Sequence, residues 1–315
     1  MGRINLRSYR DRSAIVGVAA ALVWIGGSPV HAAIPLPAPV VSLVGTPDGH
    51  AAGSNDWTCA PTTEHPNPVV LLHGTSQNRQ NDWKTLSPVL KGEGYCVFAP
   101  TFGNFPTMPW PLNAVGGIRP MEDSAKDLAA FVDRVLAATN ADRVDLVGHS
   151  QGTIMPAHYV RFLGGETKVD KYVSLASMWA GSHRPPYEQI VQTADRYGIR
   201  DQLEEGLREV GCGSCPQLIA DSSWFRKLSA VGPYADSVHY TNIVTKYDTV
   251  VVPYTSGILK APNATNIVLQ EQCPADLIEH GDIVDDPIAG VHVLNALDPE
   301  HPRPVPCFPV PPELD

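Results

Sequence analysis

Short apolar runs alternate with amphipathic segments along most of this chain. The runs are continuous and short, as in strands buried on both faces of a parallel sheet, and lie at 68–75, 95–102, 144–147, 169–176, 239–245 and 265–270. Between them, apolar residues suited to one face of a helix predict helices at 82–91, 124–139, 153–163 and 287–297. This alternation predicts an α/β fold with a mostly parallel central sheet, flanking helices and right-handed crossovers.

The alternation is interrupted between residues 182 and 237. This segment holds two helix-like pieces, a Cys-x-x-Cys sequence and a Trp-Phe pair. We expect it to form a cap-like insertion within a single domain that covers residues 33–315. The apolar residues Trp224, Phe225 and Leu228 are candidates for binding an acyl chain, and packing inside the insertion is the alternative.

Residues 1–32 have the pattern of a secretory signal peptide. Four arginines within residues 3–12 precede an apolar run at 14–26, and Val-His-Ala at 30–32 is a suitable cleavage site. The apolar run is short for a membrane span, although an uncleaved anchor is the alternative. We therefore expect a secreted, extracellular protein that begins after cleavage near Ala32.

The chain is acidic, with 23 Lys and Arg residues against 33 Asp and Glu residues. Removal of the predicted leader takes away four arginines and one aspartate, which leaves 19 against 32 and a net charge of −13. This charge argues against binding to nucleic acid or to anionic membranes through electrostatics. We expect a monomer.

Six cysteines follow the leader, and in an exported protein they are expected to form disulfides. Six cysteines allow fifteen pairings, among which the chain order suggests Cys59–Cys96, Cys212–Cys215 and Cys273–Cys307. The alternative for the Cys212–Cys215 sequence is a redox or zinc site, but no second pair of ligands accompanies it.

The pentapeptide Gly148-His149-Ser150-Gln151-Gly152 stands between a predicted strand and a predicted helix. This context is typical of a nucleophile elbow, in which a sharp turn lifts a serine hydroxyl to the tip of a sheet. The two glycines are expected because side chains there would collide with neighbouring backbone. The alternative is a glycine-rich turn with Ser150 as an ordinary helix cap.

A serine nucleophile needs a base and an orienting acid, which in such sheets follow in the order Ser, Asp or Glu, His. Asp248 comes just after the predicted strand 239–245 and is the candidate acid. Downstream of it only His280, His292 and His301 are available as the base. His292 lies inside a predicted helix and His301 in a Pro-rich tail, so His280 is the candidate base.

A tetrahedral intermediate also needs hydrogen-bond donors for its oxyanion. Gln151, the residue after the nucleophile, is one candidate through its backbone N–H. Thr75, in the His73-Gly74-Thr75 turn after the first strand, is the other, and its hydroxyl offers a third donor. The alternative for this turn is a plain strand end.

Taken together these residues resemble the secreted actinobacterial class 2 lipases, which are α/β-hydrolases. The similar stretches span about residues 55–307 and include Asn-Asp-Trp-Thr-Cys at 55–59, Val-Leu-Leu-His-Gly-Thr at 70–75, Gly-Tyr-Cys-Val-Phe-Ala at 94–99, residues 129–136 and 144–152, Tyr-Asp at 247–248 with Pro-Tyr at 253–254, Cys-Pro at 273–274, His280 and residues 293–297. Residues 245–253 are also similar to the acid loop of fungal lipase B enzymes. The resemblance implies a Ser150–Asp248–His280 triad, Thr75 and Gln151 in the oxyanion hole, and the three disulfides suggested above.

The chain departs from the family pattern at two places near the expected acyl pocket. Thr153 stands where the family usually has a second glycine, and residues 182–186 lack the Asn-His-Gly-Thr type of sequence expected in close relatives. A β-branched residue at 153 is expected to tighten helix packing or to narrow the pocket. These departures leave the triad intact and leave the substrate range open.

The sequence therefore predicts a serine carboxyl-ester hydrolase, a lipase or esterase that cleaves acyl esters such as acylglycerols. It needs neither a cofactor nor a metal, and transient contact with a lipid interface is expected. An acyltransferase or a cutinase-like polyester hydrolase would use the same triad, and product analysis with an acceptor alcohol would separate these activities. A binding protein on a hydrolase scaffold is the alternative of another class, but it predicts a missing triad member.

Overall fold

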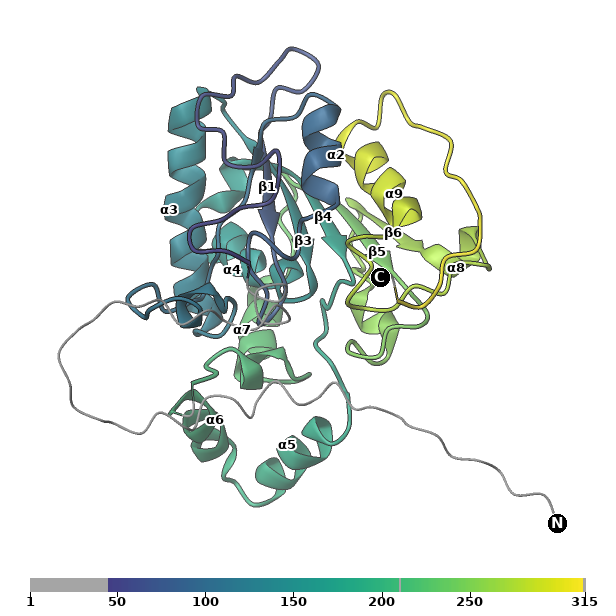
Figure 1. Cartoon of the computed structure of the whole chain (residues 1–315). Helices are drawn as coiled ribbons and strands as arrows, with labels where there is room; N and C mark the ends of the chain where they lie inside the picture. Colours follow the sequence, from purple (N-terminus) through teal and green to yellow (C-terminus); the bar gives the residue numbers. More distant parts are fainter. Residues whose placement is uncertain (1–44, 210, 314–315) are drawn as a thin grey trace. The chain divides into compact units, whose positions relative to one another are not determined.

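The computed structural model describes residues 45–209 and 211–313. The predicted signal peptide lies outside these residues. Six strands form one fully parallel sheet in the order β2-β1-β3-β4-β5-β6 (Figure 1). Their bounds are β1 Val69–Leu72, β2 Val97–Phe98, β3 Val144–His149, β4 Val169–Leu175, β5 His239–Val244 and β6 Ala264–Val268.

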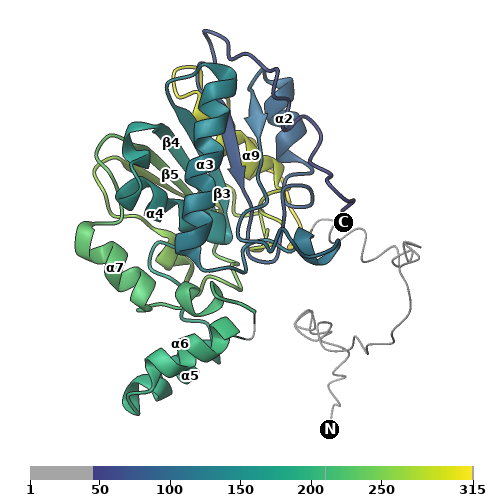
Figure 2. The same ribbon diagram turned by 90° about the vertical axis from the view of Figure 1, so that its left-hand side faces the viewer.

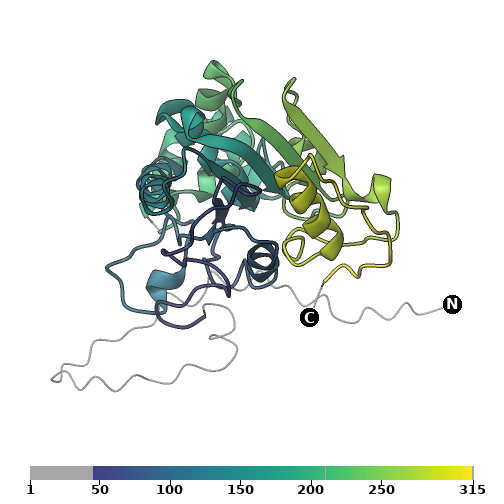
Figure 3. The same ribbon diagram turned by 90° about the horizontal axis from the view of Figure 1, so that it is seen from above.

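Helices cover both faces of this sheet, with α3 and α9 on opposite faces (Figures 2 and 3). Among the described residues, no helix is both long and apolar enough to cross a membrane. The α-helices are α2 Leu86–Gly92, α3 Met121–Thr139, α4 Met155–Phe162, α5 Tyr187–Arg196, α6 Arg200–Glu209, α7 Ser223–Val231, α8 Leu269–Gln272 and α9 Pro287–Leu297. Short 3₁₀ helices are η2 Leu112–Ala114, η3 Ser150–Thr153, η4 Gly165–Thr167, η5 Cys215–Leu218 and η6 Tyr254–Gly257.

The apolar run of β1 is continuous because both faces of this strand are buried. Its four residues are fully buried, and neighbouring side chains point to opposite faces of the sheet. Val70 and Leu72 join the core cluster that includes residues of α3 and α4, whereas Val69 and Leu71 join the cluster that includes residues of α2 and α9. The predicted parallel sheet between two helical layers is therefore confirmed.

Most predicted elements differ from the structure by a few residues at their ends, and three of them show how. The helix expected at 82–91 begins only at Leu86, because the Asp82 side chain turns inward to bind buried groups. The strand expected at 95–102 pairs only over Val97–Phe98, since it lies at the sheet edge and the backbone N–H of Ala99 donates to the Asn55 side chain instead. The strand expected at 265–270 ends at Val268, where α8 begins.

The segment 182–237 divides into two parts that pack differently. Helix α7 contacts α4, and its Trp224, Phe225 and Leu228 are buried in the same cluster as α3 and α4. Helices α5 and α6 pair with each other (Figure 1). Exposed apolar side chains lie on α5 and in the turn between the two helices, among them Tyr187, Ile190, Tyr197 and Ile199. In this structure the three α7 side chains are therefore packed in the core, as the alternative expected. Their binding of an acyl chain stays a prediction.

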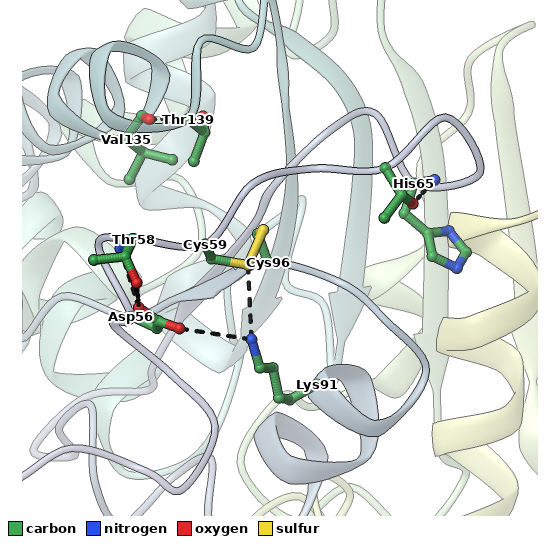
Figure 4. Close-up of a disulfide and its surroundings, with 9 residues drawn as sticks. Asp56, Thr58, Cys59, His65, Lys91, Cys96, Val135 and Thr139 are labelled. Carbon is green, nitrogen blue, oxygen red and sulfur yellow. Dashed lines mark hydrogen bonds and ion pairs between the residues drawn. A yellow bond between two sulfur atoms is a disulfide. The ribbon is translucent and has the colours of Figure 1, made fainter.

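The structure forms the three disulfides that the chain order suggested, Cys59–Cys96, Cys212–Cys215 and Cys273–Cys307. The first of them joins the segment before β1 to the residue that precedes β2. Lys91, in the last turn of α2, lies beside it (Figure 4), with its Nζ 3.7 Å from Cys59 Sγ and 3.9 Å from an Asp56 oxygen. This arrangement attaches the N-terminal segment of the described residues to the edge of the sheet.

Candidate active site

Ser150 is the first residue of η3, in the sharp turn directly after β3, and α4 follows. Its φ angle is 52°, in the left-handed region that non-glycine residues rarely adopt. A Cβ atom added at Gly148 would lie 2.0 Å from the Gly152 carbonyl oxygen, and one added at Gly152 would lie 1.9 Å from the Leu72 carbonyl oxygen. Only glycine therefore fits on either side of Ser150, and the strand–turn–helix geometry predicted for an elbow is present.

The structure brings Ser150, His280 and Asp248 into one chain of hydrogen bonds. Ser150 Oγ is 2.8 Å from His280 Nε2, and His280 Nδ1 is 2.8 Å from Asp248 Oδ2. A carboxylate can only accept, so Nδ1 donates to Asp248 and the lone pair of Nε2 faces the serine hydroxyl. His280 is thereby held in the tautomer that can accept the proton of Ser150.

Asp248 is buried at the carboxyl end of β5 and holds two further donors. Its Oδ1 accepts from the backbone N–H groups of Val250 and Val251, at 2.8 and 2.6 Å. Only 2% of its side chain is exposed, so these contacts replace the water that a carboxylate would otherwise bind. The turn after the strand therefore fixes the orientation of the carboxylate toward His280.

Thr75 and Gln151 face each other beside Ser150. The Thr75 hydroxyl donates to Gln151 Oε1 at 3.3 Å, and the backbone N–H of Gln151 lies at the start of η3, where helical N–H groups lack intrahelical acceptors. The loop 103–120 holds the turn that carries Thr75 in place through two backbone hydrogen bonds of 2.9 Å. Ser76 donates its N–H to the Gly116 carbonyl, and Gly116 donates its N–H to the Gln77 carbonyl. These two hydrogen bonds were not predicted from the sequence, in which the Gly116-Gly117 pair of the long loop was their only sign.

His73 supports the same turn as a neutral side chain. Its Nδ1 donates to the Gly74 carbonyl at 2.8 Å, and its Nε2 accepts from the backbone N–H of Phe102 at 3.1 Å. Burial lowers the pKa of His73 to about 4 and outweighs the opposing hydrogen bond to Gly74 and the charge of Asp82. The ring also stacks on Phe102, so the described contacts of His73 hold the backbone of this turn.

A second histidine–aspartate pair lies directly behind the elbow. His149 Nδ1 is 3.1 and 3.0 Å from the two carboxylate oxygens of Asp82, and His149 Nε2 is 3.0 Å from the carbonyl oxygen of His280. Asp82 Oδ2 also accepts from the backbone N–H of Gly74 at 2.8 Å. Sequence reasoning missed this pair because it placed Asp82 in a helix and treated His149 only as the variable residue of the pentapeptide.

A sequence model of the lipase (class 2) family matches residues 66–291. The chain belongs to the class 2 lipase family. Triacylglycerol lipases of Pseudarthrobacter phenanthrenivorans and Burkholderia plantarii are 28% and 29% identical to it over 137 residues, or 42% of this chain. The matched segment is 39% and 35% of their lengths, so the chain spans well under half of these curated relatives.

The crystal structure of Aspergillus fumigatus lipase B shares the fold of this class 2 lipase family member. Its TM-score is 0.59 at 16% sequence identity, and the superposition covers 82% of this chain and 56% of that one. The predicted α/β-hydrolase fold is therefore confirmed. The actinobacterial origin and the secretion that the resemblance implied stay predictions.

Thr153, at the position where this class 2 lipase family member departs from the expected glycine, closes the turn that carries Ser150. Its hydroxyl donates to the Ser150 carbonyl at 2.6 Å, and Tyr172 donates its hydroxyl to the Thr153 carbonyl at 3.0 Å. Thr153 is fully buried. These hydrogen bonds stabilise the turn, while tighter helix packing and a narrower pocket stay predictions.

The other downstream histidines lie away from this chain of hydrogen bonds. His292 is buried in α9, where burial lowers its pKa, and its Nε2 has no hydrogen-bond partner among the described residues. His301 is exposed and pairs with Asp298. Within the described residues only His280 joins Ser150 to an aspartate.

Proposed function

We propose that this chain is a secreted serine carboxyl-ester hydrolase, a lipase or esterase acting on acyl esters such as acylglycerols. The hydrogen-bonded order Ser150, His280, Asp248 at 2.8 Å per step is the observation that carries the proposal. Membership of the class 2 lipase family supports it, as does the name of the two curated relatives, which are triacylglycerol lipases.

The geometry suits acyl transfer to Ser150 and then to water. As Ser150 Oγ attacks the ester carbonyl, His280 Nε2 accepts its proton and Asp248 stabilises the imidazolium that forms. The backbone N–H groups of Thr75 and Gln151 donate to the oxyanion. His280 returns the proton to the leaving alcohol, and water, activated by the same nitrogen, then releases the carboxylic acid and restores Ser150.

Substitution of Ser150 by alanine tests this function. We expect hydrolysis of a soluble p-nitrophenyl ester and of an emulsified triacylglycerol to fall by about 10⁴-fold or more, because the nucleophile is lost. Ser174→Ala is the matched control, since Ser174 is buried in β4 and its hydroxyl has no hydrogen-bond partner within residues 45–209 and 211–313. Wild-type turnover by a folded Ser150→Ala variant would refute the mechanism.

The pair of helices α5 and α6 suits contact with lipid aggregates. Between them lies an apolar hollow of about 370 Å³, lined by residues that include Pro186, Ile190, Ile199 and Leu203. Hydrolysis rates over esters of increasing acyl length, measured below and above their solubility limit, test this part. We expect rates to rise above the limit in wild type and to rise less in an Ile190→Ser, Ile199→Ser variant; an equal rise in both would contradict it.

A further inference from the structure

The pair Asp82–His149 touches all three segments that form the candidate active site. Through Asp82 it binds the N–H of Gly74, next to Thr75, and through His149 it binds the carbonyl of His280. His149 is also the residue that precedes Ser150 in the chain. One buried pair, whose two residues are 67 positions apart in sequence, therefore joins the oxyanion turn, the elbow and the loop of the base, where His280 is 131 positions from His149.

The acceptors around His149 determine where its protons lie. The carbonyl oxygen of His280 can only accept, so Nε2 must carry a hydrogen. A neutral ring with its hydrogen on Nε2 would turn the lone pair of Nδ1 toward the Asp82 carboxylate, which is unfavourable. A second proton must therefore lie between Nδ1 and Asp82, and with it on Nδ1 the pair is an imidazolium and a carboxylate.

The charges around the pair favour this ionised form. Burial opposes charge on both groups, but the facing charge and hydrogen bond outweigh it, so the pKa of His149 is raised and that of Asp82 is lowered. The other titratable groups that face the pair are His73, which is neutral, and the candidate triad residues Asp248 and His280. The two buried histidines thus differ in charge because only His149 is hydrogen-bonded to the Asp82 carboxylate, whereas His73 is hydrogen-bonded to backbone groups.

We propose that Asp82 and His149 are positioning residues, with His149 permanently protonated, that hold the oxyanion turn and the His280 loop at a fixed distance from Ser150. The kinetic consequence of this proposal rests on the proposed function, whereas the protonation state of the His149 ring does not. Loss of either bond frees the Gly74 N–H or the His280 carbonyl. A misplacement of about 1 Å at reacting groups costs on the order of 10²-fold in rate.

Two variants and one spectrum test the proposal. His149→Phe keeps a planar aromatic ring, slightly larger than imidazole, and removes both hydrogen bonds, and Asp82→Asn keeps an acceptor for Gly74 but removes the charge. We expect kcat on a soluble ester to fall about 10- to 100-fold in His149→Phe and less in Asp82→Asn, with KM unchanged in both. His292→Phe, at a buried histidine outside the network, is the control and keeps wild-type kcat.

The ring nitrogens of His149 are read by two-bond ¹⁵N–¹H correlation spectra, with the signal assigned by its loss in His149→Phe. We expect both nitrogens to be protonated at pH 8, where an ordinary exposed histidine is neutral, and the ring to become neutral in Asp82→Asn. A neutral His149 in the wild type at pH 8 overturns the proposal, as does wild-type kcat in folded His149→Phe. Absence of any ester hydrolysis in wild type would refute the proposed function instead, while the spectrum still decides the state of the pair.

Discussion

Two buried histidine–aspartate pairs lie at the carboxyl end of the sheet and differ in what the second ring nitrogen contacts. In both, Nδ1 faces an aspartate at about 3 Å. Nε2 of His280 faces the Ser150 hydroxyl, which can donate a proton, whereas Nε2 of His149 faces a carbonyl oxygen, which cannot. We therefore expect the same two side chains to form a base that can gain a proton in one place and a fixed cation in the other.

This difference shows that a histidine–aspartate pair is not by itself a sign of catalysis. The third group decides the role, because only a partner with an exchangeable hydrogen lets the ring act as a base. The contrast can be tested by substitutions that should affect the two pairs to very different extents.

The largest expected effect is at His280. His280→Ala removes the base, so we expect kcat to fall by about 10⁵- to 10⁶-fold, as for other losses of a triad histidine. His292→Ala, at the buried histidine in α9, should keep most of the activity. Both are measured as kcat on a soluble ester, with circular dichroism to show that the variants fold. Near-normal turnover by His280→Ala, or loss of it only in His292→Ala, would reverse the assignment.

Asp248→Asn should come next. The amide would turn an N–H toward Nδ1 and favour the tautomer with hydrogen on Nε2, which cannot accept the proton of Ser150, so we expect kcat to fall about 10⁴-fold. The same change at Asp82 should cost far less, because His149 moves no proton. Equal losses in Asp248→Asn and Asp82→Asn would show that the two pairs do not differ in role. The measurement is kcat for both variants under one set of conditions.

The meeting of Ser150, Asp248 and His280 could be anticipated from the sequence, whereas the Asp82–His149 pair could not. The carboxyl ends of parallel strands share one edge, so residues just after two predicted strands are expected to meet there. No local pattern separates Asp82 from a solvated residue in the first turn of a helix. Its burial depends on a partner 67 positions away.

The fold could likewise be predicted where a local pattern of buried residues identifies an element, and not where the element depends on distant contacts. Runs buried on both faces, such as Val69–Leu72, need no partner to be recognised. The ends of elements and helix α7 depend on tertiary contacts, since the apolar face of Trp224 and Leu228 packs against a cluster formed by distant helices. Periodicity indicates that a face is apolar but does not say what it covers.

A smaller effect is expected at Thr75, which lies beside the turn that Asp82 holds. Thr75→Val removes the hydroxyl but keeps the backbone N–H, so we expect kcat to fall by up to about 10²-fold, the lower end of the cost of losing one oxyanion donor. Thr75→Ser keeps the hydroxyl and is the matched control. If Thr75→Val matches the wild type, the turn acts through its backbone alone, and the hydroxyl serves only to bind Gln151.

A third buried carboxylate, that of Asp286, extends the comparison because it faces another carboxyl group rather than a histidine. Asp286 caps α9 by accepting from the N–H groups of Ile288 and Ala289, and it faces the carboxyl group of Asp276. Burial and, to a smaller extent, the charge of Asp276 raise the pKa of Asp286 to about 6 against the two backbone hydrogen bonds, which lower it. The shift is thus opposite to that of Asp82, whose neighbour is a cation.

The raised pKa of Asp286 determines the direction in which stability changes with pH. The folded state holds the Asp286 proton more tightly than the unfolded state, whose pKa is about 3.9, so stability from this group is present below that pH and is lost as pH rises toward about 6. Asp286→Asn keeps a cap of similar quality and cannot ionise. We expect its free energy of unfolding, from urea titrations, to vary less between pH 4 and 6 and to exceed that of wild type at pH 7.5 by roughly 1–2 kcal/mol. A variant that is less stable at pH 7.5 with the wild-type pH dependence would mean that Asp286 is stabilised as an anion, as Asp82 is.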